Sequence, residues 1–321
     1  MPESPVQNSE STEACNSAWD SLYSASLYLP AAPSADNDAV LWHYTDTVGL
    51  VGILQSNRLW ATAAPMLNDT SELAYGLSLA EETLSDVLKS DHPSQGEINF
   101  LDATLRRAVT ALKGNGVYVF CASEAPDDLA QWRGYAGGSG YSIGLHPTQL
   151  AVISNLPNLL LQMQAALPSW RRVLYDVTAQ RKLLEQSWRA IPGLREKYSS
   201  LGKHTHQAIA EGGLVGVVTC LKNPGFRSER EVRFVVDGRN LSGATKFRAG
   251  AVGVIPYLEL GAGTTSSRFT LVVPDAIPLP AVEVMVGPGH DQDTAERGVR
   301  TLLDSAGHAE AKITRSEVPY R

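Results

Sequence analysis

Residues 116–123 read GVYVFCAS, an almost unbroken apolar run that is rich in β-branched and aromatic residues. A run of this length and composition is typical of a strand buried on both faces of a sheet. Before it, residues 99–114 carry apolar side chains at helical spacing. After it, residues 127–136 open with two carboxylates, which favour a helix N-terminus. The sequence therefore predicts a buried strand between two helices.

The rest of the chain extends this mixture of strands and helices. Further predicted strands lie at 40–45, 58–63, 141–145, 231–237, 253–260, 268–273, 282–287 and from 311 to the C-terminus. Further predicted helices lie at 48–57, 67–90 and 293–307, and the stretch at about 148–218 is mainly helical in pattern. We therefore expect one α+β domain over residues 38–321, with a helical insertion at about 148–218.

Composition limits the possible functions. The chain has 321 residues and a formal net charge of −7, which disfavours a broad electrostatic contact with DNA or RNA. Its three cysteines form no CxxC pair, so we expect neither a disulfide framework nor a zinc site. No membrane-spanning run or signal peptide is evident, and we expect a cytoplasmic protein or an effector secreted into a host cytosol. Residues 1–37 have the composition of a disordered polar leader.

Two candidate ligand-binding residues lie in the predicted strand at 40–45. Because side chains alternate along a strand, His43 and Thr45 point to one face and Tyr44 to the other. A neutral imidazole and a hydroxyl can both hydrogen bond to a ribose or a carboxamide. A core histidine with a satisfied ring is the simpler alternative.

More polar candidates follow along the chain. Arg58 stands between the first helix and the next strand, where its guanidinium would suit a pyrophosphate. In the segment LNDTSE, Asn68, Asp69 and Glu72 either cap a helix or reach into a shared site. Trp132 and Tyr135 are three residues apart on a predicted helix, so they form either a core stripe or a platform for a heteroaromatic ring.

The segment FRSEREVRFVVD carries the most distinctive carboxylates. Glu229 and Glu231 are two residues apart at the start of the predicted strand, so they share a face with Arg233. The pattern suits either a solvated sheet edge or a pocket that stabilises a cationic transition state. If both carboxylates face one pocket, their mutual repulsion raises the pKa of one of them.

The ordered set of short motifs resembles a bacterial family known as domain of unknown function 2971. The pieces that carry the resemblance are HYT, LWATAAPMLNDTSE, VYVFCASE, DDLAQWRGYA, GYSIGL, EREVRF, VIPYLEL, VMVGPG and SEVPYR. They cover most of the chain from about residue 41 to residue 321. The family name itself implies no activity.

A second resemblance is to the ADP-ribosyltransferase fold, which implies a split mixed sheet and NAD as the co-substrate. In that fold a histidine on the first strand holds NAD, aromatic side chains hold the nicotinamide, and a late glutamate stabilises an oxocarbenium-like state. On this chain the first motif corresponds to His43 and Thr45. The second corresponds to Tyr118, Ser123, Trp132 or Tyr135, and the third to Glu231, or to Glu229 in an ExE-like arrangement.

The resemblance therefore implies an NAD-dependent ADP-ribosyltransferase without a metal, in the class of toxins, effectors or phage-defence proteins, acting on an unidentified acceptor. A nucleotide or nucleic-acid hydrolase using Asn68, Asp69, Glu72 and Glu231 is a second hypothesis. A nucleotide-sensing module without catalysis is a third.

Overall fold

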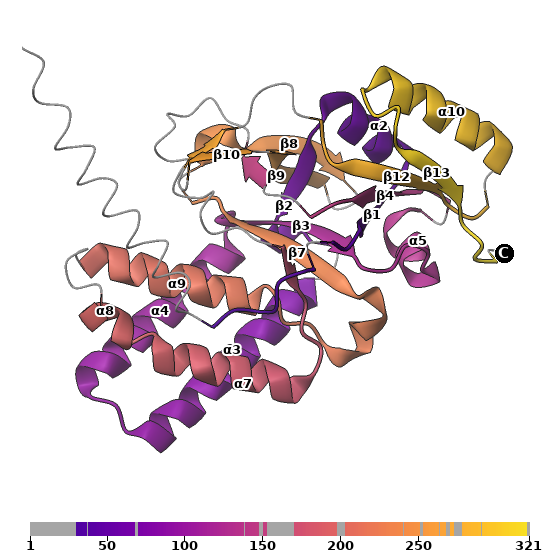
Figure 1. Cartoon of the computed structure of the whole chain (residues 1–321). Helices are drawn as coiled ribbons and strands as arrows, with labels where there is room; N and C mark the ends of the chain where they lie inside the picture. The colour runs from indigo at the N-terminus through magenta and orange to yellow at the C-terminus, as the bar shows by residue number, and fades with distance from the viewer. Residues whose placement is uncertain are drawn as a thin grey trace, which may run out of the picture.

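The computed structural model describes residues 30–36, 38–67, 70–137, 139–147, 150–152, 170–197, 203–239, 241–250, 253–262, 264–267, 270–272, 278–289 and 291–319. Within these residues the chain is α+β, as the sequence predicts, and its main sheet is mixed. The main sheet runs in the order β13-β12-β4-β1-β3-β2-β9-β5, with β6, β7 and β8 attached beside that path. The elements follow one another along the chain as in Figure 1.

The N-terminal half supplies β1 (Leu41–Thr45), α2 (Thr47–Ser56), β2 (Leu59–Ala63), η1 (Ala64–Met66), α3 (Thr70–Asp91), α4 (Gln95–Lys113), β3 (Val117–Ser123), α5 (Leu129–Tyr135), β4 (Tyr141–Leu145) and β5 (Leu150–Val152). The first helix is capped by Asp46, whose carboxylate accepts a hydrogen bond from the Gly49 amide (2.7 Å). Asp128 caps α5 in the same way, which confirms the helix start predicted from the paired carboxylates.

The C-terminal half supplies β6 (Trp170–Arg172), α7 (Val177–Ala190), α8 (Gly193–Lys197), α9 (Lys203–Val218), η3 (Pro224–Glu229), β7 (Glu231–Asp237), η4 (Ser242–Ala244), β8 (Lys246–Gly250), β9 (Gly253–Ala262), β12 (Ala281–Val286), α10 (Gln292–Ser305) and β13 (Lys312–Arg315). A separate two-stranded ladder joins β10 (Thr264–Ser267) to β11 (Thr270–Val272). The predicted insertion is helical from α7 to α9, but β5 and β6 within it join the main sheet.

The main sheet branches at β3. All seven of its residues pair with β7 along one edge. On the other edge β2 pairs near the start of β3, at Tyr118 and Val119, and β1 pairs at its end, at Ser123. The strands β1, β3 and β7 are therefore neighbours, and β3 is the strand that links the two parts of the sheet.

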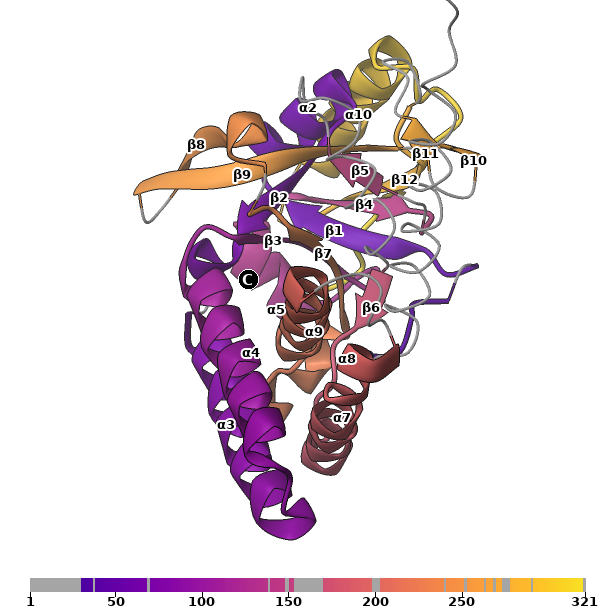
Figure 2. The ribbon, with the colours of Figure 1, turned by 90° about the vertical axis from the view of Figure 1, so that its left-hand side faces the viewer.

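Helices cover both faces of this sheet. Figures 1 and 2 show α3, α4, α7 and α9 on one side and α2 with α10 on the other. Val117 and Val119 of β3 belong to the core on the side of α3 and α4, whereas Tyr118 and Phe120 belong to the core on the side of α2. Burial on both faces explains the unbroken apolar run of β3.

Part of the segment expected as a leader packs against the domain. The Ala35 amide donates to the Trp170 carbonyl (3.0 Å), and the Arg172 amide donates to the Pro33 carbonyl (2.8 Å). Ala32 and Ala35 are buried. Residues 30–36 therefore lie along β6, and residues 1–29 lie outside the described residues. Among the described helices, none combines the length and the apolar character needed to cross a membrane.

Candidate functional site

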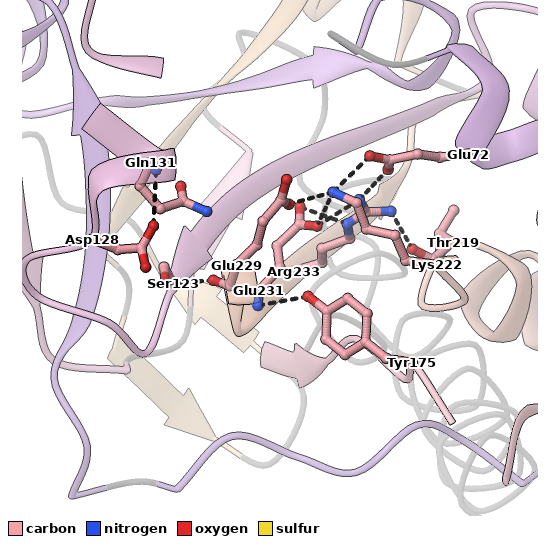
Figure 3. A network of polar contacts seen from close by, with 10 residues as sticks. All are labelled: Glu72, Ser123, Asp128, Gln131, Tyr175, Thr219, Lys222, Glu229, Glu231 and Arg233. Atoms are coloured by element: carbon pink, nitrogen blue, oxygen red, sulfur yellow. Dashed lines mark hydrogen bonds and ion pairs between the residues drawn. The ribbon is translucent and has the colours of Figure 1, made fainter. Parts of the chain in front are cut away.

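A buried lysine lies at the centre of the most concentrated polar cluster (Figure 3). The Lys222 ammonium is 2.6 Å from Oε1 of Glu72, 2.5 Å from Oε2 of Glu229 and 3.1 Å from Oε2 of Glu231. The Lys222 side chain is only 1% exposed. Three carboxylates thus share one ammonium group, and one of them, Glu72, comes from a distant part of the sequence.

A buried arginine binds two of these carboxylates from the other side. The Arg233 guanidinium donates to both oxygens of Glu231 (2.8 Å each) and to Oε2 of Glu72 (2.5 Å). Its Nη1 donates to the Thr219 carbonyl (2.7 Å). We call Glu72, Lys222, Glu229, Glu231 and Arg233 the carboxylate cluster. With all five groups ionised, its three carboxylates and two cations leave one net negative charge.

Local backbone structure brings these side chains together. Glu231 and Arg233 alternate with apolar residues on β7, so both project from the face that α3 covers, where Glu72 lies in the first turn. Glu229 ends η3 before the strand begins, so the prediction that it shares a strand face with Glu231 is wrong. Arg230 follows it in the left-handed conformation, with φ of 42°. This kink directs the Glu229 carboxylate back to Lys222.

The environments of Glu229 and Glu231 differ. The side chain of Glu229 is 13% exposed, whereas those of Glu231 and Glu72 are each 7% exposed. Burial raises the pKa of Glu229, and the nearby charges of Glu231 and Glu72 add to this effect against the attraction of Lys222. Burial also opposes ionisation of Glu231, but Arg233 and Lys222 outweigh it and lower the pKa of Glu231 to about 2. Glu231 therefore stays ionised, and Glu229 takes up a proton more readily.

Aromatic and hydroxyl groups surround the carboxylate cluster. The Glu231 amide donates to the Tyr175 hydroxyl (3.0 Å), and the Lys222 ammonium lies 4.9 Å from the centre of the Phe226 ring. Tyr135 is 36% exposed and lies within electrostatic reach of Lys222, Glu229 and Glu231. Burial raises the pKa of Tyr135, so its phenol keeps its proton at neutral pH. Tyr135 is therefore an exposed aromatic side chain close to the carboxylates.

Ser123 supports the cluster through the backbone. Its hydroxyl donates to the Glu229 carbonyl (2.6 Å) and accepts from the Ala125 amide (3.0 Å). Figure 3 shows Ser123 between the cluster and the capping pair Asp128 and Gln131. Ser123 thus positions the segment that bears Glu229.

The structure places His43 on the face of the sheet opposite the carboxylate cluster. Trp42 pairs with Ser123, and Ser123 pairs with Glu231, so Trp42 and Tyr44 share the face of Glu231. The His43 ring instead packs on Phe120, with 4.5 Å between ring centres. Its Nδ1 lies 2.9 Å from the Cys121 carbonyl, which only accepts, so Nδ1 carries the proton. Burial lowers the pKa of His43 to about 4.

Three other predicted residues also lie away from the cluster. Thr45 shares the face of His43 and packs under α2, where a Cβ at Gly49 would lie 1.9 Å from its hydroxyl oxygen. Arg58 lies in the turn between α2 and β2 and donates to the Asn57 carbonyl (3.0 Å). Tyr118 projects into the α2-side core, and its hydroxyl lies 3.1 Å from that of Thr245.

Trp132 is a core residue, unlike Tyr135. It is 0% exposed, packs edge-to-face on Tyr44 at 4.7 Å, and donates from Nε1 to Asp127 (2.6 Å). The two aromatic residues therefore do not form one exposed platform, although they are three residues apart. Asn68 and Asp69 lie outside the described residues.

Sequence reasoning missed Lys222 and Tyr175. Lys222 follows the apolar segment GLVGVVTCL, and a lysine directly after such a run was the available signal for a buried cation. Tyr175 binds the cluster only through a backbone amide, which no sequence pattern indicates. Across the described residues, no group of three or more His, Cys, Asp and Glu side chains is arranged to hold a metal ion.

The comparisons with known proteins match a segment that bears most of the carboxylate cluster. Residues 131–234 match a family described as "Protein of unknown function (DUF2971)". The matched segment includes Tyr135, Lys222, Glu229, Glu231 and Arg233. No curated protein and no solved structure gives a significant match. The resemblance to the DUF2971 family, whose function is unknown, is therefore confirmed over residues 131–234.

Proposed function

We propose that the protein is an NAD-dependent ADP-ribosyltransferase whose active site is the carboxylate cluster. One observation carries the proposal: Glu229 and Glu231 bind the same ammonium group but have pKa values shifted in opposite directions. Enzymes that break glycosidic bonds commonly use two carboxylates with different pKa values. One of them exchanges a proton, and the other remains charged.

Glu231 and Glu229 have separate roles in this proposal. The bond between the ribose C1′ and the nicotinamide nitrogen breaks, its electron pair leaves with nicotinamide, and a ribosyl oxocarbenium ion forms. The net negative charge of the cluster, with Glu231 ionised, stabilises this cation. The nucleophile of the acceptor then forms a bond to C1′ and gives its proton to Glu229. If water is the acceptor, the product is free ADP-ribose.

Tyr135 is the side chain proposed to hold the nicotinamide ring. It is the exposed member of the pair Trp132 and Tyr135, and it lies beside the carboxylates. A phenol ring offers a flat apolar face to a heteroaromatic ring. His43 has no role in this version of the site, because its ring lies against Phe120 on the other face of the sheet.

The arrangement of strands supports the resemblance to ADP-ribosyltransferases. The three motifs assigned to that resemblance lie on neighbouring strands, although His43 on the first of them faces away from the carboxylate cluster. Here the strands that bear HYT, VYVFCAS and EVRF are β1, β3 and β7, which are neighbours in the branched sheet.

A nucleotide hydrolase is the second candidate, and one observation favours it. Arg233 binds Glu72 and Glu231, which are two of the residues that this hypothesis assigns to the site. Such a site would release a nucleoside monophosphate, inorganic phosphate or shorter oligonucleotides, and it would leave the nicotinamide bond intact.

The deciding experiment measures nicotinamide released from NAD by the full chain, with and without a cell lysate as a source of acceptors. The same samples are assayed for AMP from NAD, for phosphate from ATP and for shortened oligonucleotides. We expect nicotinamide release by the wild type and its loss in Glu229→Gln. The matched control is Glu211→Gln, because Glu211 is likewise a largely buried, ion-paired carboxylate, with Arg107 and Arg239 as partners, but lies outside the cluster.

The outcomes separate the candidate functions. Release that fails in Glu229→Gln and persists in Glu211→Gln supports the transferase. AMP, phosphate or shortened oligonucleotides without nicotinamide would overturn it in favour of the hydrolase. Saturable NAD binding without any product would instead leave a nucleotide-sensing module.

A further inference from the structure

Two buried donors on β2 and β8 have no hydrogen-bond acceptor among the described residues. They are Nε1 of Trp60 and Nε of Arg248. Leaving such a donor buried and unpaired destabilises the folded state, and does so more strongly for a charged group. Folded proteins rarely leave these donors unpaired, and an absent bound group is one common reason when they do. Two such donors in one place therefore need an acceptor.

The two donors lie at one place in the fold. β9 pairs with β2 on one side and with β8 on the other. Trp60 pairs with Glu259 and Arg248 with Ile255, so the two lie four residues apart along β9, on one face of the sheet. The Arg248 Cζ is 6.0 Å from the centre of a Trp60 ring, and the rings of Trp60 and Tyr257 are 5.4 Å apart. On the other side of Trp60, a Cβ at Gly52 would lie 2.7 Å from its ring. The tryptophan is therefore closely packed, and its N–H has a defined direction.

The charge of Arg248 indicates which kind of acceptor would bind at its open Nε donor. Its Nη2 donates to a neutral group, the Thr62 hydroxyl (3.1 Å). In the described part of the chain it forms no ion pair, although Asp46 acts on it from a longer distance. By contrast, Lys246 on the same strand pairs with Glu259 (2.8 Å). A partly buried guanidinium with an open donor favours an anion over a neutral acceptor.

We infer that Trp60 and Arg248 form a binding site for the phosphate group of a small ligand, held by hydrogen bonds from Trp60 Nε1 and Arg248 Nε. Planar guanidinium donors match phosphate oxygens, and an indole N–H supplies a further directed bond. β8 is largely exposed along its length and Arg248 is its partly buried residue, so the site lies close to solvent. None of its residues belongs to the carboxylate cluster, so the inference stands independently of the proposed function.

The test uses the full chain and measures both the melting temperature and the heat of binding. Potassium phosphate is titrated against potassium chloride at equal ionic strength, and pyrophosphate and ADP are titrated in parallel. We expect a saturable increase in Tm with phosphate, and tighter binding of pyrophosphate or ADP if the phosphate belongs to a larger ligand. Acetate in the same titration distinguishes a carboxylate from a phosphate ligand.

Two conservative variants identify the site. Trp60→Phe keeps an aromatic ring but removes Nε1–H, and Arg248→Lys keeps the charge but removes the planar donors. Each is expected to weaken phosphate binding at least tenfold. Lys246→Gln, which removes a neighbouring positive charge, is expected to bind phosphate as the wild type does.

Several results would overturn the inference. Equal phosphate affinity in the wild type, Trp60→Phe and Arg248→Lys would place any binding elsewhere. No saturable phosphate response in the wild type would mean that an ordered water satisfies these donors.

Discussion

Glu229 and Glu231 bind the same ammonium group although only Glu231 belongs to a strand. The Lys222 nitrogen lies 2.5 Å from Oε2 of Glu229 and 3.1 Å from Oε2 of Glu231, and Arg230 between them has a positive φ. Glu231 also binds Arg233 through two N–H groups, whereas Glu229 is the more exposed carboxylate. Of these two carboxylates, Glu231 therefore stays ionised at neutral pH, and Glu229 exchanges a proton more readily.

Exchanging each carboxylate for its amide should separate catalysis from stability. Glu229→Gln should lower the rate of nicotinamide release about 100-fold or more, because general acid–base catalysis contributes about 10²–10⁴. Glu231→Gln should also slow release, because it removes a charge that stabilises the cation. Unlike Glu229→Gln, it should in addition lower the free energy of unfolding by about 3–5 kcal/mol, because it leaves Arg233 and Lys222 with less buried negative charge. Turnover assays and urea unfolding of both variants test this difference. A fully active Glu229→Gln would contradict the assigned role.

Removing the central ammonium should make the protein less stable at neutral pH than in mild acid. Lys222→Met leaves the buried carboxylates with Arg233 alone, at a cost of about 3–5 kcal/mol. The pKa of Glu229, already raised, then rises further above its unfolded value. A folded state that binds more protons than the unfolded state gains stability as pH falls. Urea unfolding at pH 7.5 and pH 5.5 should therefore show a smaller loss at pH 5.5.

The control for this change is Lys246→Met. Lys246 forms an exposed ion pair with Glu259, and its side chain is 54% exposed. Such pairs contribute at most about 1 kcal/mol, so the control should change little at either pH. An equal loss for Lys222→Met at both pH values would show that the carboxylates are not coupled through Lys222.

His43 should make the folded protein sensitive to acid. Its pKa is about 4 in the folded protein and 6.5 in the unfolded chain. Between pH 4 and pH 6.5, His43 is therefore protonated in the unfolded chain and neutral in the folded protein. The stabilisation is present above pH 6.5 and is lost as pH falls towards 4, by roughly 3 kcal/mol in total. His43→Asn keeps a donor for the Cys121 carbonyl but does not titrate, so its unfolding free energy should fall less over this range.

The same variant tests the placement of His43 relative to the carboxylate cluster. His43→Asn should release nicotinamide at close to the wild-type rate, because the imidazole lies on the opposite face of the sheet from Glu231. A loss of turnover with an unchanged melting temperature would show that His43 acts in the active site.

Trp132 and Tyr135 should respond differently to truncation. Trp132→Ala removes a fully buried ring and should cost about 3–5 kcal/mol of stability. Tyr135→Ala should leave the melting temperature nearly unchanged and raise KM for NAD about tenfold, since stacking on a base is worth about 1–3 kcal/mol. Thermal unfolding and steady-state kinetics of both variants distinguish these effects. An unchanged KM in Tyr135→Ala would exclude it as the stacking residue.

Local patterns determined most of the secondary structure. The apolar run of 116–123 predicted β3, and paired carboxylates predicted the start of α5 at Asp128. These predictions succeeded because hydrophobic periodicity and helix capping depend on residues close together in the chain. The membership of Glu72 and Glu231 in one polar site was also among the sequence hypotheses, although the fold was needed to join them through Arg233.

The tertiary structure alone decided how the candidate residues were grouped. Side-chain alternation correctly separated Tyr44 from His43, but only the pairing of Trp42 with Ser123 and of Ser123 with Glu231 showed which of them shares the face of Glu231. Lys222 became the centre of the cluster because α9 ends beside β7, which no local pattern specifies. The sequence by itself thus determined the elements and the chemical types of the candidate residues. Strand register and one left-handed residue, which depend on contacts between distant segments, decided which of those residues meet.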